Sequence, residues 1–163
     1  MPFDTDNPVY TSGRINTKDK VELQYGYWEI RAKLPSGVGT WPAIWMLNSK
    51  IDSIGWPNCG EIDIMEHWGS NQNYVSSAMH TPSSSGGTIN HGGQSIATVS
   101  SQFHLYSLEW TPEKMVFSVD GNVHYTYNPV HKNSDTWPFN ADQYLLLNIA
   151  IEPSIASSFV ESA

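Results

Sequence analysis

The chain has 163 residues, which suits one domain with a real hydrophobic core, and its formal net charge is −8. Eight Lys and Arg stand against sixteen acidic residues, so we expect no nucleic-acid partner, because binding to a phosphate backbone needs clustered cations. Cys59 is the single cysteine, which excludes an intrachain disulfide and a thiolate metal site, and no apolar run is long enough to cross a membrane.

Strands dominate the elements predicted along the chain. Apolar residues alternate through residues 21–34, and the phase changes at Gly26, which indicates a bulge or bend within one long strand. Further strands are predicted at residues 40–48, 60–68, 73–80, 103–110, 114–120, 122–127 and 143–151. The Ser- and Gly-rich residues 82–93 predict a long surface loop. No convincing helix appears, because the apolar spacing is mostly two.

The short connections between these strands predict the fold class. Asp120-Gly121 is a strong hairpin signal between two of the strands. Many antiparallel strands without helices indicate an all-β antiparallel sandwich or jelly roll, in which a curved sheet provides a concave groove. We find no internal repeat and expect one domain over residues 1–163.

The most informative strand carries three carboxylates, Glu61, Asp63 and Glu66. Alternation places Glu61 and Asp63 on one face, whereas Glu66 has the wrong parity to join them. A β-bulge at Met65 would return Glu66 to the acidic face. Carboxylates this close repel one another, so we expect at least one to hold a proton near neutral pH. A carboxylate beside a protonated acid is what cleavage of a glycosidic bond needs.

The same cluster has two other interpretations. Three carboxylates beside His67 also fit a solvated edge or a site for a hard metal ion. Calcium sites usually come from loops with Gly and Asn interleaved, whereas this strand is flanked by Ile. The sequence therefore favours catalysis over a metal site.

Aromatic residues near the acidic strand are candidates for contacts with a sugar. Trp41 and Trp45 share one face of residues 40–48, and an indole offers a flat apolar surface with an N–H donor. The alternative is that both fill the core. Trp56 is a further candidate, although Gly55-Trp56-Pro57 resembles a loop.

Three polar residues are also candidates for the groove. His80 could hydrogen-bond a sugar or Glu66, or be a structural histidine. Asn148 lies on the face opposite its leucine neighbours, so it could point at a ligand or lie on the surface without a role. Arg31 could reach hydroxyl groups at the groove edge or simply face solvent.

At this point the chain resembles glycoside hydrolase family 16. Glu61-Ile-Asp-Ile-Met-Glu66 is similar to the family signature in the bulged form of its laminarinase-like members. Supporting segments run through nearly the whole chain in family order, at residues 10–16, 39–47, 55–60, 107–110, 117–121 and 145–149. The resemblance implies a β-jelly roll that holds an extended glucan in its concave sheet.

The resemblance also implies roles for single residues. Glu61 corresponds to the catalytic nucleophile, Glu66 to the general acid/base, and Asp63 to a residue that hydrogen-bonds the nucleophile. The implied reaction is retaining double displacement, for which the carboxyl groups must lie roughly 5–5.5 Å apart. Trp41 and Trp45 correspond to positions on the glycone side of the cleft, and His80 to a position near the acid/base.

The implied substrate is β-1,3-glucan, with mixed-linkage β-glucan next. Agar and carrageenan enzymes share the catalytic signature, so a red-algal galactan is a further alternative. We expect no cofactor, and the lack of a long apolar run predicts no membrane partner. The resemblance also implies secretion, although the N-terminus lacks a signal-peptide pattern.

Two departures from the family pattern affect these expectations. Only residues 1–9 precede the match, and the chain stops at Ala163, where relatives usually have further strands. We therefore expect a shortened domain without the family calcium site, and open sheet edges that favour self-association. Residues 148–154 replace a Gly-Gly-x-Trp segment of many relatives, so one stacking Trp is expected to be missing. The alternatives to an enzyme are a lectin-like module that binds glucan without cleaving it and an incomplete piece with little activity.

Overall fold

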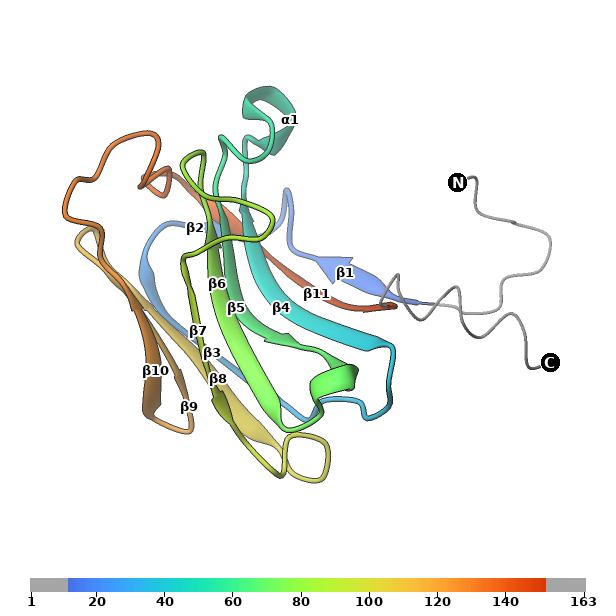
Figure 1. The fold of residues 1–163 in the computed structure, drawn as a ribbon. Helices are drawn as coiled ribbons and strands as arrows, with labels where there is room; N and C mark the ends of the chain where they lie inside the picture. Colours follow the sequence, from blue (N-terminus) through green and yellow to red (C-terminus); the bar gives the residue numbers. More distant parts are fainter. Residues whose placement is uncertain (1–11, 152–163) are drawn as a thin grey trace, which may run out of the picture.

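The computed structural model describes residues 12–151, and these residues form two antiparallel β-sheets packed face to face (Figure 1). The elements in chain order are β1 (Arg14–Asn16), β2 (Glu22–Leu23), β3 (Gly26–Ala32), β4 (Thr40–Asn48), α1 (Ile51–Ile54), β5 (Glu61–His67), η1 (Gly69–Asn71), β6 (Tyr74–His80), β7 (His91–Ser95), β8 (His104–Trp110), β9 (Met115–Val119), β10 (Asn122–Tyr127) and β11 (Gln143–Ile151). One sheet has seven strands in the order β1-β11-β4-β5-β6-β7, with β2 also paired to β11. The other has four strands in the order β10-β9-β8-β3.

This architecture confirms the predicted all-β antiparallel sandwich. The bounds of β4, β10 and β11 are those expected, and β6, β8 and β9 begin one residue later than predicted. The Asp120-Gly121 hairpin is present, with Val119 opposite Asn122. Asp120 and Gly121 have φ values of 50° and 78°, which is why a short polar residue followed by glycine occupies the turn.

The predicted single strand at residues 21–34 is wrong. It is two strands in different sheets, because β2 pairs with β11 and β3 pairs with β8. The chain crosses between the sheets at Tyr25 and Gly26, whose φ values are 65° and 110°. The phase change at Gly26 therefore marks a change of sheet rather than a bulge.

Two further expectations need correction. The predicted loop at residues 82–93 contains the start of β7, an edge strand, and the chain forms the four-residue helix α1 where none was expected. Glycine lets β7 approach its neighbour, since a Cβ on Gly93 would lie 2.4 Å from the backbone oxygen of Val75. Within residues 12–151, no helix combines the length and apolar character needed to cross a bilayer.

The core lies between the two sheets, but the four-stranded sheet covers only part of the wider one. Ile44 of β4 faces the core and is 4% exposed. Its neighbours on the same side of the sheet continue through Leu147 of β11 to Ile15 of β1. Ile15 is 67% exposed and Ile149 of β11 is 42% exposed. Within residues 12–151, an apolar strip at the β1–β11 end is therefore left uncovered by the narrow sheet.

In the described part of the chain, β7 forms one edge of the wide sheet, and β1 and β2, which both pair with β11, form the other. The edge strands of the narrow sheet are β3 and β10. Self-association through such edges stays a prediction. The expectations about residues 1–9 and about residues after 151 lie outside the described residues.

Candidate active site

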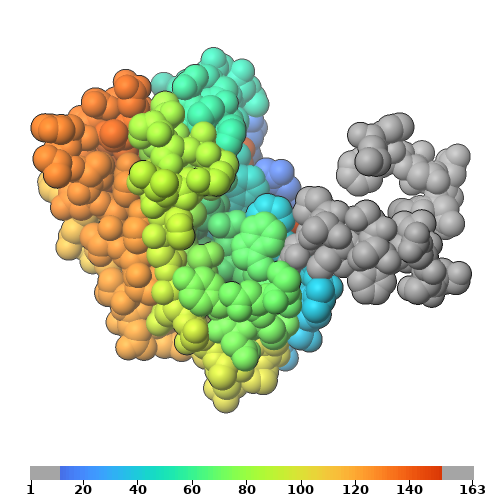
Figure 2. Space-filling view, in the orientation of Figure 1, coloured from blue at the N-terminus to red at the C-terminus, as the bar shows by residue number. Residues whose placement is uncertain are grey.

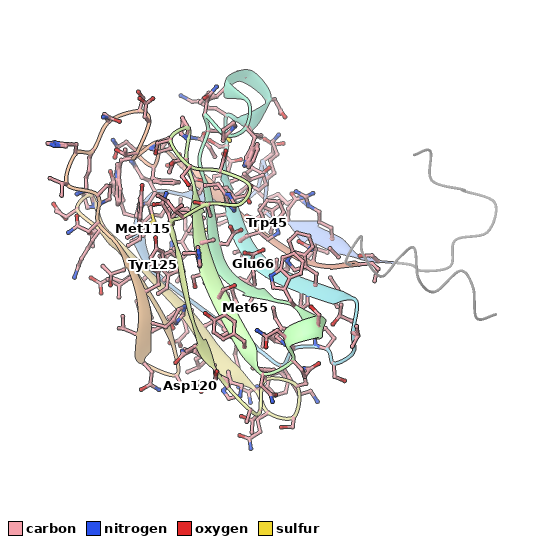
Figure 3. The ribbon with its side chains drawn as sticks, viewed as in Figure 1. Trp45, Met65, Glu66, Met115, Asp120 and Tyr125 are labelled. Carbon is pink, nitrogen blue, oxygen red and sulfur yellow. The ribbon has the colours of Figure 1, made fainter. Side chains whose placement is uncertain are left out.

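A β-bulge in β5 brings the three carboxylates onto one face of the wide sheet. The pairs across β4 and β5 are Leu47 with Glu61, Trp45 with Asp63 and Ala43 with Glu66, and the register shifts between Ile44 and Trp45. Ile64 and Met65, which lie between the second and third acids, are 2% and 1% exposed and belong to the core. Two consecutive residues therefore face inward, and Glu66 returns to the outer face as predicted. Figure 3 labels Met65 and Glu66 on this strand, beside Trp45 of β4.

The acidic face forms the floor of a cavity of about 470 Å³. Its lining comes from β4, β5, β6 and the start of β7, from the loop that precedes β7, from the turn after α1 and from the residue between β5 and η1. The residues are Trp41, Trp56, Glu61, Glu66, Trp68, Ser76, Ala78, His80, Gly86, Gly87, Thr88 and His91. Figure 2 shows the hollow between the yellow-green loop and the green atoms of β5 and η1. A flat ligand with polar edges fits such a mixture of indoles and carboxylates.

Burial sets the electrostatics of the three acids. Burial first, and then the nearby charge of Asp63, raise the pKa of Glu61 to about 8. Burial also holds the pKa of Asp63 well above its ordinary range, and the charge of Glu66 adds to this. Burial raises the pKa of Glu66, whereas a hydrogen bond from Trp41 acts in the opposite direction. The set therefore retains protons near neutral pH, which leaves an acid beside a carboxylate.

His80 faces the first two acids rather than Glu66, which corrects the expected hydrogen bond to Glu66. The backbone N–H of Gly86 donates a 3.1 Å hydrogen bond to its Nδ1, so in the neutral ring the proton is on Nε2. Nε2 lies 3.0 Å from Oδ2 of Asp63 and 3.7 Å from Oε1 of Glu61. The loop before β7 thus sets the tautomer of His80 and places Nε2 near both carboxylates, while Oδ2 of Asp63 makes no hydrogen bond. The hydrogen bond expected between Asp63 and Glu61 stays a prediction.

Trp41 and Trp68 form an aromatic pair beside Glu66. Their ring centroids lie 3.9 Å apart with an interplanar angle of 24°. Nε1 of Trp41 donates a 3.1 Å hydrogen bond to Oε1 of Glu66. The sequence analysis missed Trp68, although a signal was available: it lies two residues after Glu66, so alternation places both on the same face.

Trp45 and Asn148 lie on the same face of the sheet but outside the cavity lining. Nε1 of Trp45 donates a 2.6 Å hydrogen bond to Oδ1 of Asn148, which therefore holds an indole in place. The guanidinium of Arg14, also missed by the sequence analysis, lies 4.7 Å from the Trp45 ring centroid. These three residues extend the polar and aromatic face toward β1.

The two remaining candidates differ in outcome. Trp56, in the turn after α1, lines the cavity, and its ring centroid lies 5.9 Å from that of His80. Arg31 is in β3 of the other sheet, where its guanidinium lies 4.1 Å from the Phe103 ring centroid. Its predicted place at the groove edge is therefore wrong, because the outward face of β3 is not the face that bears the acids.

Glu61, Asp63 and His80 also form the one cluster in residues 12–151 that could hold a metal ion, with ligand atoms all within 4.8 Å of one another. Two carboxylates and an imidazole suit a divalent transition metal. An ion there would occupy Glu61, the carboxylate expected from the sequence to be the nucleophile. A metal role and a glycosidase role therefore exclude each other at this site.

Comparison with known proteins agrees with the family resemblance found in the sequence. The chain matches Glycosyl hydrolases family 16 over residues 3–152. It is 43% identical over 152 residues to a beta-glucanase of Rhodothermus marinus, a match that covers 87% of this chain and 53% of that protein. The crystal structure of laminarinase from Flavobacterium sp. UMI-01 is similar with a TM-score of 0.83 at 49% identity, covering 85% of this chain and 60% of that one.

A further relative, whose name describes binding rather than hydrolysis, is a beta-1,3-glucan-binding protein of Penaeus monodon. It is 31% identical over 178 residues, and the match covers 89% of this chain and 47% of that protein. The chain thus spans about half the length of these two curated relatives.

Proposed function

Because the chain belongs to glycosyl hydrolases family 16, we propose that it is an endo-acting β-glucan hydrolase whose preferred substrate is β-1,3-glucan. The observation that carries this proposal is the position of Glu61, Asp63 and Glu66 on one face of a bulged strand. Two of these acids line a cavity that also contains three tryptophans. A neutral polymer suits this site, since a chain of net charge −8 repels polyanions.

The proposed reaction is a retaining double displacement. Glu61 attacks the anomeric carbon as a carboxylate, while Glu66 donates its proton to the leaving oxygen and the glycosidic bond breaks. Glu66, now ionised, takes a proton from the incoming water, which attacks the anomeric carbon and releases Glu61. The raised pKa of Glu66 supports this role, because a general acid must be protonated at the working pH.

Asp63 and His80 assist Glu61 in this proposal. Asp63 is 3% exposed and lies between the two reacting carboxylates on the strand. When it holds a proton it leaves Glu61 free to ionise, since the repulsion between their charges disappears. Nε2 of His80 lies near both groups, and its N–H dipole stabilises the negative charge that they share.

The aromatic pair supports the choice of substrate class. Trp41 and Trp68 stack on each other beside Glu66, and indole surfaces of this kind favour the C–H faces of a sugar ring. The linkage is the finer part of the proposal. Laminarin, barley mixed-linkage β-glucan and agarose should be compared, and we expect activity to decrease in that order.

The test is release of reducing sugar from laminarin by the wild type and by Glu61→Ser and Glu66→Ala. We expect each variant to lose at least about 100-fold in kcat, the scale of a lost acid/base or nucleophile. Glu109→Gln is the matched control, because Glu109 is an exposed carboxylate in β8 of the other sheet. Equal sugar release by wild type and both site variants would refute the hydrolase proposal. Proton NMR of the first product distinguishes retention from inversion.

A second candidate function is glucan binding without cleavage. It is favoured by the relative named as a beta-1,3-glucan-binding protein and by the aromatic lining of the cavity. Titration calorimetry with laminarin oligosaccharides separates the two functions. Binding by a wild type that releases no reducing sugar would support the binding module.

A further inference from the structure

A buried serine binds a backbone carbonyl inside the bulge in β5. The register between β5 and β6 shifts from Asp63 opposite Ala78 to Glu66 opposite Ser76. Ser77 lies at this shift and is fully buried. Its hydroxyl donates a 2.7 Å hydrogen bond to the backbone oxygen of Ile64, inside the bulge.

The same serine is bound from the facing sheet. Nε2 of His124 in β10 lies 2.8 Å from the Ser77 Oγ. The Ser77 proton is already used by Ile64, so Oγ must accept and Nε2 must carry the proton. Nδ1 is then an acceptor, and Nε2 of Gln94 lies 3.3 Å from it as the donor. These bonds form one consistent chain from Gln94 through His124 and Ser77 to the bulge.

His124 itself occupies a second irregularity. The register between β10 and β9 shifts between Val123 and Tyr125, so His124 is the extra residue of a bulge in the narrow sheet. Gly92 of β7 permits the close approach, since a Cβ there would lie 2.9 Å from Tyr125 and 3.0 Å from the backbone oxygen of His124. The side chains of His124 and Ser77 thus connect the bulge in β10 to the backbone of the bulge in β5.

We propose that Ser77 and His124 are positioning residues that hold the β5 bulge in the form that places Glu66 in the cavity. The inference rests on the proposed function, in which Glu66 is the general acid. Glu66 is the second residue after Ile64, so a bulge that relaxes toward another register moves its carboxylate along or away from the acidic face. Burial lowers the pKa of His124, which agrees with the neutral ring that the chain of bonds requires.

The test uses a substrate whose leaving group needs no proton. A β-1,3-linked disaccharide with a 2,4-dinitrophenyl aglycone releases a stable phenolate, whereas laminarin releases an alkoxide that Glu66 must protonate. For Ser77→Ala and His124→Leu we expect kcat on laminarin to fall about 10- to 100-fold, the effect of a misplaced catalytic group. The kcat/KM for the dinitrophenyl substrate should stay within about threefold, because its first step does not use the acid.

Two matched variants distinguish positioning from general loss of structure. His124→Gln keeps an N–H at the reach of the imidazole Nε2, and it should restore most of the laminarin activity. Tyr127→Phe removes another hydrogen bond of β10, from the Tyr127 hydroxyl to the Thr136 oxygen. It should leave the ratio of the activities on the two substrates unchanged. An equal loss on both substrates in Ser77→Ala and His124→Leu would overturn the proposal.

A measurement on the wild type keeps the proposal testable if these variants do not fold. In ¹⁵N NMR of the imidazole rings, His124 should be neutral at pH 7 with its proton on Nε2. The opposite tautomer or an imidazolium would overturn the chain of hydrogen bonds. A wild type that cleaves no laminarin would instead overturn the proposed function, and the NMR result would still decide the tautomer.

Discussion

The indole N–H of Trp41 donates a hydrogen bond to Oε1 of Glu66 across 3.1 Å. Burial raises the pKa of Glu66, and this hydrogen bond opposes the rise by favouring the charged form. Trp41→Phe keeps an aromatic ring but removes the donor, so the pKa of Glu66 should rise further. We expect the alkaline limb of the pH–rate profile to move to higher pH, because Glu66 stays protonated for longer.

The matched control for this prediction is Trp45→Phe. It makes the same change in a residue whose N–H binds Asn148 instead of a carboxylate. Measurement of kcat/KM on laminarin against pH should show no shift of the alkaline limb in Trp45→Phe. A limb that moves to lower pH in Trp41→Phe would contradict the assignment of Glu66 as the acid.

Asp63 should set the acidic limb of the same profile. Activity requires Glu61 to be ionised, and the charge of Asp63 is the second cause, after burial, that raises the pKa of Glu61. Asp63→Asn keeps position 63 neutral at every pH, whereas the wild-type Asp63 shares the proton of the coupled set and is charged part of the time. The pKa of Glu61 should therefore fall, and the acidic limb should move to lower pH. Asp142→Asn, an exposed acid in the loop before β11, is the control. An acidic limb that stays in place or rises would disprove this coupling.

Ionisation of the buried Glu61 should lower the free energy of unfolding at alkaline pH. The pKa of Glu61 is about 8 in the folded chain, against about 4.3 for an ordinary Glu. Between these values the folded state holds a proton that the unfolded state has released, so the free energy of unfolding falls as pH rises. Above about pH 8 the stabilisation from that proton is lost. Glu61→Gln lacks the part of this dependence that Glu61 contributes, and it should be more stable than the wild type at pH 8 by about 1–3 kcal/mol. This is less than the full shift implies, because Glu61 shares protons with Asp63 and Glu66.

The measurement is urea unfolding of both proteins at pH 5 and pH 8. At pH 5 the folded wild type still keeps the proton, so the difference between the two proteins should be much smaller. Glu113→Gln, at an exposed position before β9, should change the free energy of unfolding at neither pH. A Glu61→Gln protein that is less stable than the wild type at pH 8 would show that the ionised side chain is well accommodated.

Gly69 should tolerate no side chain. A Cβ there would lie 1.9 Å from the backbone oxygen of Gly37 and 2.6 Å from Oγ1 of Thr40. Since a backbone atom cannot rotate away, Gly69→Ala should lower the free energy of unfolding by about 1–3 kcal/mol. It should also lower activity, because Trp68 is the preceding residue. Gly13→Ala, with no atom within 4 Å of the added Cβ, should unfold at the same urea concentration as the wild type.

The acidic strand was predictable because its argument needs only residue counting. Alternation fixes the face of each residue, and the odd spacing between Asp63 and Glu66 requires one extra residue in between. The structure places both Ile64 and Met65 in the core at that point. The hairpin at Asp120 was predictable for a similar reason, since few residues accept its positive φ.

Alternation does not reveal which sheet a strand joins, and this explains the main errors. A sandwich has two outward faces, so a polar residue that points outward can lie on either. Arg31 was correctly expected to point outward, but it lies on the narrow sheet, away from the acids. The division of residues 21–34 has the same cause, because pairing partners decide it. Strand β7 escaped notice since its Gly92 and Gly93 leave no alternation to read.

The incomplete cover of the wide sheet has a consequence for handling the protein in solution. Ile15 of the edge strand β1 and Ile149 of the neighbouring β11 expose apolar side chains to water. The fluorescence of anilinonaphthalene sulfonate, a dye that binds exposed apolar surface, should therefore increase when the native protein is added without denaturant. The signal should fade when Ile15 and Ile149 are both replaced by Thr, while cleavage of laminarin continues unchanged.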